Sequence, residues 1–287
     1  MRKPLWLNKR VDFKKTERMN FLLNDLRLST ICKEAKCPNI SDCFSQGVAS
    51  FLILGRVCTR DCQFCALRKG HAEDIDLEEG KRIAEAVRRL ALKYVVITSV
   101  SRDDLADGGA EVFANTIREI YKVNREILIE VLTPDFKGEE KAIEKVVRAK
   151  PKVFAHNLET VPGLYSVVRK GADYQRSLHL LEQVKKSNRE IYTKSGIMLG
   201  LGEKEEEVIK VFTDLRKAGC DFLSIGQYLP PSSKHFKVRE YVNPGRFLFY
   251  KRKAQELGFL YVESGPYVRT SYLAHRYIQS AIGELKD

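Results

Sequence analysis

The sequence predicts an α/β protein in which six β-α units form an open, partial barrel. From Ala49 onward, short β-rich runs alternate with amphipathic helical stretches, the pattern of a parallel sheet with crossover helices. Six such units are two short of a closed eight-fold barrel. The chain of 287 residues is 44% hydrophobic, which is enough to bury a sizeable core.

The strands are expected where apolar and β-branched residues run together. A helix is expected from about residue 79, because Asp76 and Glu79 resemble a capping box and Ile83, Val87 and Leu90 fall on one face. Before the last strand a similar stripe consists of Val208, Val211, Phe212 and Leu215. The six predicted strands are residues 50–54, 94–98, 127–132, 152–155, 196–199 and 222–226.

Two segments lie outside the repeat, and we expect them to cover the mouth of the barrel. Residues 1–49 contain a helical stretch near 16–28 and three cysteines. Residues 229–287 contain the pair Pro230-Pro231, a helix around 246–257 and a terminal helix after Pro266. The chain is therefore predicted to divide into residues 1–49, the barrel at 50–228, and residues 229–287.

Six of the seven cysteines form two close triplets, Cys32-x4-Cys37-x5-Cys43 and Cys58-x3-Cys62-x2-Cys65. A structural zinc site normally closes with four ligands, and no histidine lies within or between the triplets. Three thiolates suit a four-iron cluster that keeps one iron open. The second triplet follows the first predicted strand, at the carboxyl ends of the strands, where parallel α/β folds place their active sites.

The composition limits the partners and the compartment. The net charge of +12 leaves two interpretations open, a solvated basic surface or an acidic protein partner. Nucleic acid is not expected, because the basic residues are dispersed and no binding module appears. No apolar run is long enough to span a membrane and the N-terminus lacks a signal peptide, so close-spaced thiols indicate metal ligands in the reducing cytoplasm.

The second triplet resembles the cluster loop of radical S-adenosylmethionine (SAM) enzymes. Its spacing and its position after the first strand match, and Phe64 matches the aromatic residue that shields the cluster from water in that superfamily. The resemblance implies a four-iron cluster whose open iron chelates the amino and carboxylate groups of SAM. Electron transfer from the reduced cluster would then release a 5′-deoxyadenosyl radical.

Five further stretches are informative beside the two triplets: Lys3-Pro4-x-Trp6-Leu7, Arg102-Asp103-Asp104, His156-Asn157-Leu158-Glu159, Gly226-Gln227-Tyr228 and Arg269-Thr270-Ser271-Tyr272. Together with the triplets, they resemble the lipoyl synthase family. Thr270 departs from that family's closing pattern, Arg-Ser-Ser-Tyr, by replacing the first serine, and it keeps a hydroxyl group.

The resemblance implies sulfur insertion at C6 and C8 of an octanoyl chain that is amide-linked to a carrier lysine. Two four-iron clusters and SAM are the implied cofactors, and the auxiliary cluster is the implied sulfur donor. The implied partners are octanoylated lipoyl carrier domains, in the E2 subunits of 2-oxoacid dehydrogenases or the H protein of glycine cleavage. A flavodoxin or ferredoxin is the implied electron donor.

The resemblance also assigns the site residues. Cys58, Cys62 and Cys65 would hold the SAM cluster, and Cys32, Cys37, Cys43 and Ser271 the auxiliary cluster. From the residues alone, a helix cap is the favoured interpretation of Ser271, and loop packing is as good an interpretation of Asn157 and Glu159 as a binding role. A hydrogen-bonded structural role for His156 also stays open. The implied cofactor contacts are Phe64, Thr98, Gly108, Gly109, Asn157 and Glu159.

Two other functions remain as alternatives. Another two-cluster radical enzyme, such as one that methylthiolates tRNA, would account for the basic charge, and a zinc- or cluster-bearing binding protein would lack catalysis. Gly200-x-Gly202 is not a dinucleotide fingerprint, since Glu205 stands where the third glycine belongs. Cys220 is isolated and is expected to be a small buried hydrophobe.

Overall fold

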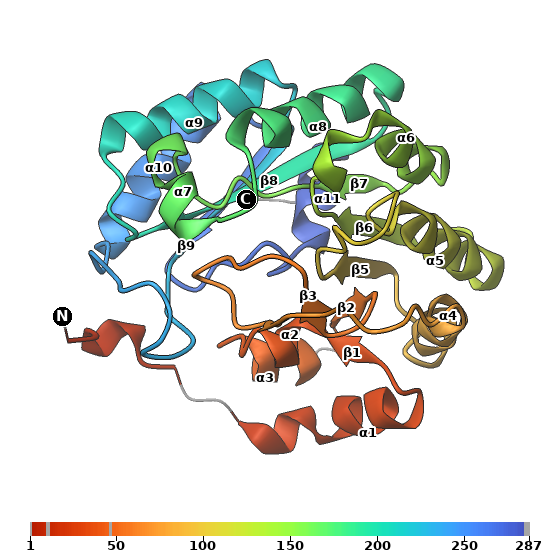
Figure 1. Ribbon diagram of the computed structural model, residues 1–287. Helices are drawn as coiled ribbons and strands as arrows, with labels where there is room; N and C mark the ends of the chain where they lie inside the picture. Colours follow the sequence, from red (N-terminus) through yellow and green to blue (C-terminus); the bar gives the residue numbers. More distant parts are fainter. Residues whose placement is uncertain (1, 10–11, 46–47, 284–287) are drawn as a thin grey trace.

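A curved sheet of eight strands organises the molecule, which a computed structural model describes for residues 2–9, 12–45 and 48–283 (Figure 1). All neighbouring strands are parallel except the first pair, which is antiparallel. The strands, in their order across the sheet, are β1 Ser29–Thr30, β2 Ser50–Ile53, β5 Tyr94–Ser99, β6 Leu128–Leu132, β7 Val153–Ala155, β8 Tyr192–Leu199, β9 Phe222–Gln227 and β10 Tyr261–Gly265.

The six predicted parallel strands are present, and the open sheet agrees with a partial barrel. Strand β8 begins at Tyr192, four residues before its predicted start at Gly196. Thr193, Lys194 and Ser195, near the start of this strand, are polar but buried. Lys194 can be buried because it forms an ion pair at 3.0 Å with Glu130 of β6, whose side chain is also fully buried. A buried polar strand gives no hydrophobic signal, which explains the late predicted start.

A seventh parallel strand, β10, lies beyond the predicted repeat and pairs with β9 along its whole length. Helix α10 (Pro244–Glu256) precedes it, so these two elements form one more β-α unit with β9. The helix was expected, but the strand was not, because only Val262 within it is both apolar and buried. The sheet therefore draws one strand from residues 229–287.

Helices form an outer ring around the sheet (Figure 1). Each buries an apolar stripe; in α4, for example, Ile83 and Val87 are buried. The start of α4 differs from the predicted capping box, because Glu79 accepts a hydrogen bond from the Leu54 N–H of the neighbouring strand end, at 3.0 Å. The helices of the ring, besides α10, are α4 Glu79–Arg89, α5 Ala110–Val123, α6 Glu140–Arg148, α8 Tyr174–Ser187 and α9 Glu205–Lys217.

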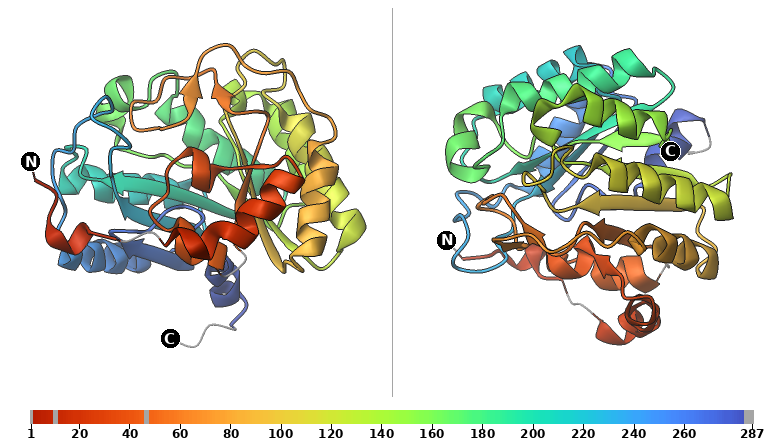
Figure 2. Two further views of the ribbon diagram at one scale, coloured as in Figure 1. Left: turned by 90° about the horizontal axis from the view of Figure 1, so that it is seen from below. Right: turned by 45° about the vertical axis from the view of Figure 1, so that its right-hand side comes forward.

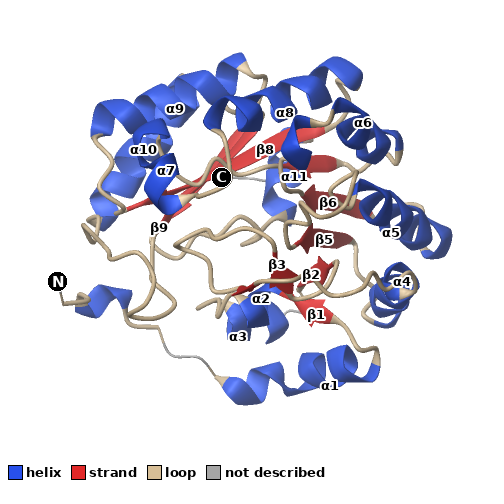
Figure 3. Ribbon diagram, viewed as in Figure 1, coloured by secondary structure: helices blue, strands red, loops and turns tan. Residues whose placement is uncertain are grey.

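The N-terminal helices lie along the β1–β2 edge of the sheet (Figure 2). Loops occupy the centre of the view inside the helix ring (Figure 3), where a small separate ladder joins β3 (Val57–Cys58) to β4 (Arg68–Lys69). Among the described residues, no helix combines the length and the apolar character needed to cross a membrane. The remaining helical elements are η1 Leu5–Leu7, η2 Phe13–Thr16, α1 Glu17–Asp25, α2 Ile31–Glu34, α3 Ile40–Ser45, η3 Phe136–Gly138, η4 Pro162–Leu164, α7 Tyr165–Val168 and α11 His275–Ala281.

Helix α11 closes the opposite end of the barrel. Its Tyr277 and Ile278 are buried against Val153 and Phe222, which are the first residues of β7 and β9. The chain therefore passes from the carboxyl end of β10 to the amino ends of the other strands within the short segment 266–274. That segment carries Ser271.

Candidate functional site

A cavity of about 430 Å³ lies where the parallel strands end. Three parts of the chain that are distant in sequence line it: the two cysteine regions, the strand ends of the barrel, and the segment after β10. This agrees with the predicted position at the carboxyl ends of the strands. The predicted site residues that line it are Cys32, Cys37, Cys43, Phe64, Cys65, Thr98, Asn157, Glu159 and Ser271.

The loop of the second triplet is fixed at Cys62 and Gln63. The three sulfurs lie near one another, since Cys65 interacts electrostatically with Cys62 and Cys58. Cys62 forms a β-bridge with Arg169, and the Gln63 N–H donates to the carbonyl of Val168 at 2.8 Å. The loop is therefore held against the segment that follows α7.

Two thiols of this loop, those of Cys62 and Cys65, are buried enough to stay protonated in the absence of metal. Burial raises the pKa of Cys62 to about 11 and that of Cys65 to about 12. The Arg169 guanidinium opposes the shift at Cys62. Iron binds thiolates, so cluster binding here would release protons, and the positive charge of Arg169 would favour it.

The first triplet forms a second group that lines the cavity with all three of its cysteines. Cys32 lies in α2, Cys37 in the loop after it and Cys43 in α3. Burial raises the pKa of Cys32 to about 12 and that of Cys43 to about 11, and the neighbouring Cys37 adds to both shifts. The ammonium group of Lys9 opposes the shift at Cys43.

Both triplets suit a cluster better than a single ion. Within residues 2–9, 12–45 and 48–283, no three His, Cys, Asp or Glu side chains are close enough to hold one metal ion. A four-iron cluster is larger than an ion and takes its thiolates from positions spaced farther apart. The donor set, three thiols in each group and no imidazole, fits iron–sulfur chemistry.

The segment that carries Ser271 is seated directly on β9. A Cβ atom on Gly226 would lie 2.2 Å from the carbonyl oxygen of Val268, so only glycine permits this approach. The Asn39 side chain, from the loop between Cys37 and Cys43, donates to the carbonyl of Tyr267 at 2.7 Å. These contacts bring Ser271 to the cavity that the first triplet lines.

Asn157 and Glu159 lie at the cavity, at the end of β7. The Asn157 amide donates to a Glu159 carboxylate oxygen at 2.9 Å and to the Thr270 hydroxyl at 2.8 Å. Its carbonyl oxygen is buried and has no hydrogen-bond partner among the described residues. Burial raises the pKa of Glu159, against the opposing charge of Arg169. An unpaired buried acceptor at a cavity wall indicates a place for a ligand donor.

Gly108 and Gly109 do not line the cavity and instead allow close packing at the start of α5. Gly109 has φ +90°, and a Cβ there would lie 2.3 Å from a methyl carbon of Leu54. A Cβ on Gly108 would lie 3.0 Å from the ring of Phe136. Their contact with the cofactor stays a prediction.

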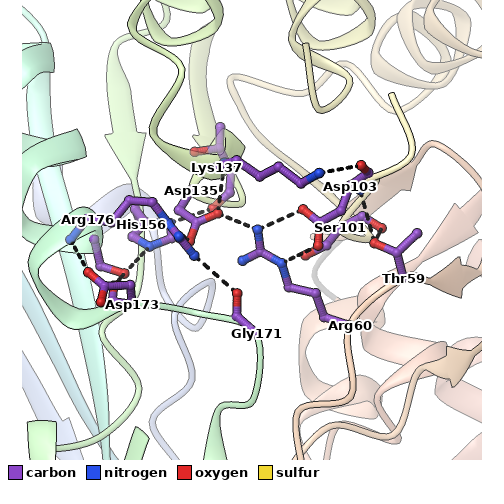
Figure 4. Close-up of polar contacts among 12 residues, drawn as sticks. Thr59, Arg60, Ser101, Asp103, Asp135, Lys137, His156, Gly171, Asp173 and Arg176 are labelled. Carbon is purple, nitrogen blue, oxygen red and sulfur yellow. Dashed lines mark hydrogen bonds and ion pairs between the residues drawn. The ribbon is translucent and has the colours of Figure 1, made fainter. Parts of the chain in front are cut away.

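Sequence reasoning missed a buried ionic network behind the second triplet (Figure 4). Arg60 pairs with both oxygens of Asp103 and with Asp135, and Asp135 also pairs with Arg176 of α8. The partners of Arg60 lie 43 and 75 residues away, so no local pattern links them. The one available signal was an arginine placed between two predicted cluster ligands.

His156 belongs to this buried region and is structural. Its ring nitrogens contact the carbonyl of Thr133 at 2.8 Å and the hydroxyl of Ser177 at 3.0 Å. Burial and the positive charge of Arg169 together lower the pKa of His156 to about 3. The ring therefore stays neutral at physiological pH and does not exchange protons with the cavity.

Two other sequence interpretations also agree with the structure. The Gly200-x-Gly202 loop wraps around its own carboxylate, because Glu203 accepts the N–H groups of Gly200 and Leu201 at 2.6 and 2.9 Å. These N–H groups are already paired, so they are not available to donate hydrogen bonds to a phosphate. Cys220 is fully buried, as expected for a small hydrophobe.

Comparisons with known proteins agree with this geometry. The profile of the radical SAM superfamily matches residues 52–215. A lipoyl synthase from Caldicellulosiruptor saccharolyticus is 56% identical over 274 residues, covering 95% of this chain and 96% of the relative. A lipoyl synthase from Caldanaerobacter subterraneus is 54% identical, covering 96% of each chain. A third, from a Geobacter species, is 52% identical over 97% of this chain and 96% of its own.

Solved structures are similar in fold. Methylornithine synthase superimposes with a TM-score of 0.57 at 15% identity, over 82% of this chain and 72% of its own. Coproporphyrinogen III oxidase from Escherichia coli, described as a radical SAM enzyme, gives a TM-score of 0.54 at 12% identity, over 78% of this chain and 57% of its own. At such identity these likenesses concern the architecture alone.

Proposed function

The chain belongs to the lipoyl synthase family of the radical SAM superfamily, and from this premise we propose how its residues divide the work of sulfur insertion. The enzyme converts a protein-bound octanoyl-lysine into the lipoyl cofactor by inserting sulfur at C6 and C8. Its relatives are lipoyl synthases over nearly their whole length, which leaves the tRNA methylthiolating and non-catalytic alternatives without support.

We propose that the two triplets hold two four-iron clusters with separate tasks. When bound, one cluster with SAM supplies the 5′-deoxyadenosyl radical and the other supplies sulfur. Cys58, Cys62 and Cys65 would hold the first, and Phe64 beside them would exclude water. Cys32, Cys37 and Cys43 would hold the second, with Ser271 as its fourth ligand.

One observation carries this division: a single cavity is lined by the first triplet, by Phe64 and Cys65 of the second, and by Ser271. A substrate carbon held in this cavity would therefore lie within reach of both cysteine triplets. The lining of this cavity is largely apolar, which suits an octanoyl chain and excludes water. The apolar lining includes Ile31, Val48, Leu132, Ile197, Met198 and Val268.

Asn157 and Glu159 are proposed to orient SAM, together with Thr98. The unpaired carbonyl oxygen of Asn157 supports this role, because it can accept a hydrogen bond from a bound hydroxyl or amino group. Burial raises the pKa of Glu159, and the positive charge of the neighbouring Arg169 opposes that shift. Thr98 lines the cavity, and its hydroxyl donates to the carbonyl of Leu132 at 2.9 Å.

Octanoylated lipoyl carrier domains are the proposed partners, in E2 subunits of 2-oxoacid dehydrogenases or the H protein of glycine cleavage. A flavodoxin or ferredoxin is the proposed donor of the electrons that SAM cleavage consumes. Thiols destined for iron also require reducing surroundings, so we propose that the protein works in the cytoplasm.

The assignment is tested with anaerobically reconstituted, reduced protein, SAM and an octanoylated carrier peptide, followed by mass spectrometry. The peptide is expected to gain two sulfur atoms and, once its two thiols are oxidised to the cyclic disulfide, to lose two hydrogen atoms. Replacing the second triplet by alanine is expected to abolish SAM cleavage. Replacing the first triplet is expected to leave some 5′-deoxyadenosine but no sulfur insertion. If both triple variants still bound two clusters, the ligand assignment would be wrong.

A further inference from the structure

We infer that Thr59 and Arg60 are positioning residues that hold two backbone N–H groups against the sulfur of Cys58 and thereby raise the reduction potential of the cluster at that site. This inference rests on the proposed role of Cys58 as a cluster ligand. It is independent of which substrate carbon receives sulfur.

The sulfur of Cys58 is approached by two N–H donors from different parts of the chain. The Arg60 N–H lies in the same loop, with its nitrogen 3.4 Å from the sulfur. The Ser101 N–H comes from the loop after β5, with its nitrogen 3.3 Å from the sulfur. Since hydrogen bonds to cysteine sulfur are one of the factors that set the potential of a cluster, whatever fixes these two donors also tunes the cluster.

Thr59 fastens the cluster loop to the loop that supplies the second donor. Its N–H donates to the carbonyl of Ser101 at 3.1 Å, and its hydroxyl donates to the same carbonyl at 3.0 Å. The hydroxyl also accepts the N–H of Asp103 at 3.0 Å. Three hydrogen bonds from one residue therefore fix the peptide of Ser101 relative to Cys58.

Arg60 also connects the cluster loop to the loop after β5, and it links both to the carboxyl end of β6 (Figure 4). Its guanidinium pairs with both carboxylate oxygens of Asp103, at 2.7 and 2.8 Å, and with Asp135 at 2.5 Å. Only 6% of the Arg60 side chain and none of Asp135 is exposed, so solvent does not screen this pairing.

The network is balanced in charge, which explains why it can be buried. Two carboxylates, Asp103 and Asp135, meet two guanidinium groups, Arg60 and Arg176. Breaking one buried pair leaves the other charges without compensation and is strongly destabilising. The loop that carries Cys58 is therefore held in one arrangement before any cluster arrives.

The direction of the effect on the potential follows from charge. Reduction adds one electron to the cluster and makes its sulfur ligands more negative, so N–H groups aimed at Cys58 stabilise the reduced form. Loosening Thr59 or Arg60 lets these donors drift from the sulfur. The potential is then expected to become more negative, and reduction by a weak donor is expected to slow.

Thr59→Val is the cleanest test, because valine has the shape of threonine and changes no charge. We expect the cluster-loaded variant to keep its iron content and to show a more negative midpoint potential in a redox titration followed by electron paramagnetic resonance. Thr59→Ser restores the hydroxyl and is expected to restore the potential. An unchanged potential in Thr59→Val, at full iron content, would overturn the inference.

Arg60→Lys separates geometry from charge, since lysine keeps the positive charge but cannot form the forked pairing with Asp103. We expect its potential to shift in the same direction as that of Arg60→Gln. A normal potential in Arg60→Lys with a shifted one in Arg60→Gln would mean that charge alone acts, which contradicts the inference. Arg118→Gln, which removes an exposed pair with Glu111 on α5, is the matched control and is expected to leave the potential unchanged.

The two levels of the proposal fail in different ways. If replacing Cys58 with alanine leaves both clusters and SAM cleavage intact, the ligand assignment fails. If that replacement removes the cluster but Thr59→Val and Arg60→Lys titrate like the unaltered protein, only the positioning role fails. If Thr59→Val loads poorly, the potential of its residual cluster signal still decides the question.

Discussion

Ser271 is the residue whose role depends most on the arrangement of its surroundings. It lines the cavity with the first triplet because its segment is seated on Gly226 and bound by Asn39. Its neighbour Thr270, which departs from the family pattern, accepts a hydrogen bond from Asn157. Two adjacent hydroxyl residues thus face different tasks, one toward the proposed auxiliary cluster and one toward the proposed SAM site.

Ser271→Ala is expected to keep SAM cleavage and to lose most lipoyl formation. The cluster at the second triplet is untouched, whereas the auxiliary cluster loses a ligand. The measurement is the ratio of 5′-deoxyadenosine to lipoylated peptide, which should rise at least tenfold. Such a rise corresponds to an increase of about 1.4 kcal/mol in the barrier to sulfur insertion relative to that for SAM cleavage. Thr270→Ala, which removes only the bond from Asn157, is the control and should be milder. A fully active Ser271→Ala enzyme would refute the assignment.

Glu79 offers a test of electrostatics away from the clusters. Burial raises its pKa from the usual 4.5 to about 7, although the N–H of Leu54 opposes the shift. The folded protein therefore holds a proton that the unfolded chain releases, so the free energy of unfolding falls as pH rises from about 4.5 to about 7 and is level above.

Glu79→Gln is expected to remove this pH dependence and to raise the free energy of unfolding by roughly 1–3 kcal/mol above pH 7. Anaerobic urea titrations at about pH 5 and pH 8 measure it. Glu144→Gln, at an exposed position of α6, is the control and should change little. If Glu79→Gln followed the pH dependence of the unaltered protein, the raised pKa would be disproved.

The residues that sequence reasoning found are those with a local signature. The cysteine spacing identified both triplets, and the strand ends identified Asn157 and Glu159. The spacing could not reveal that Arg60 meets Asp135, because pairing across 75 residues depends on how the strands stack. Gly226 was noticed as part of a family stretch, but its contact with Val268 exists only in the folded chain.

At the scale of elements, the segment between β10 and α11 is the decisive piece. It links the carboxyl side of the barrel to its amino side, and its path is set by a close backbone contact with β9. Strand β10 sets the direction of this segment, because its pairing with β9 fixes the point at which the chain leaves the sheet. The sequence carries no clear signal for this strand, because only Val262 within it is both apolar and buried.

Gly226→Ala is expected to displace this segment, because the new methyl group would overlap the Val268 carbonyl. The iron content should fall from about eight toward about four per chain, while SAM cleavage continues at the second triplet. Iron and sulfide analysis measures the loss. Gly163→Ala is the matched control, since its Cβ would meet Glu207 at an ordinary 3.6 Å. Full iron content in Gly226→Ala would show that the segment tolerates the shift.

At the scale of the whole molecule, the net charge of +12 favours an acidic carrier domain. The affinity for a folded carrier is expected to weaken as salt rises, because exposed charges are screened within about 8 Å at physiological ionic strength. Steady-state kinetics with the carrier at several salt concentrations measure this. A short octanoyl-lysine peptide is the control and should respond less. Equal affinity for the folded carrier at low and high salt would contradict the expectation.

The contact between Asn39 and Tyr267 joins positions 228 residues apart, so the proposed auxiliary cluster would tie the chain into a ring that encloses nearly the whole barrel. A tie across so long a loop restricts the unfolded chain strongly and thus stabilises the folded one. As proposed, the reaction would consume this cluster as its sulfur source, and the tie would be lost with it. Each turnover would therefore open the ring, and rebuilding the cluster would also mean fastening the two ends of the protein together again.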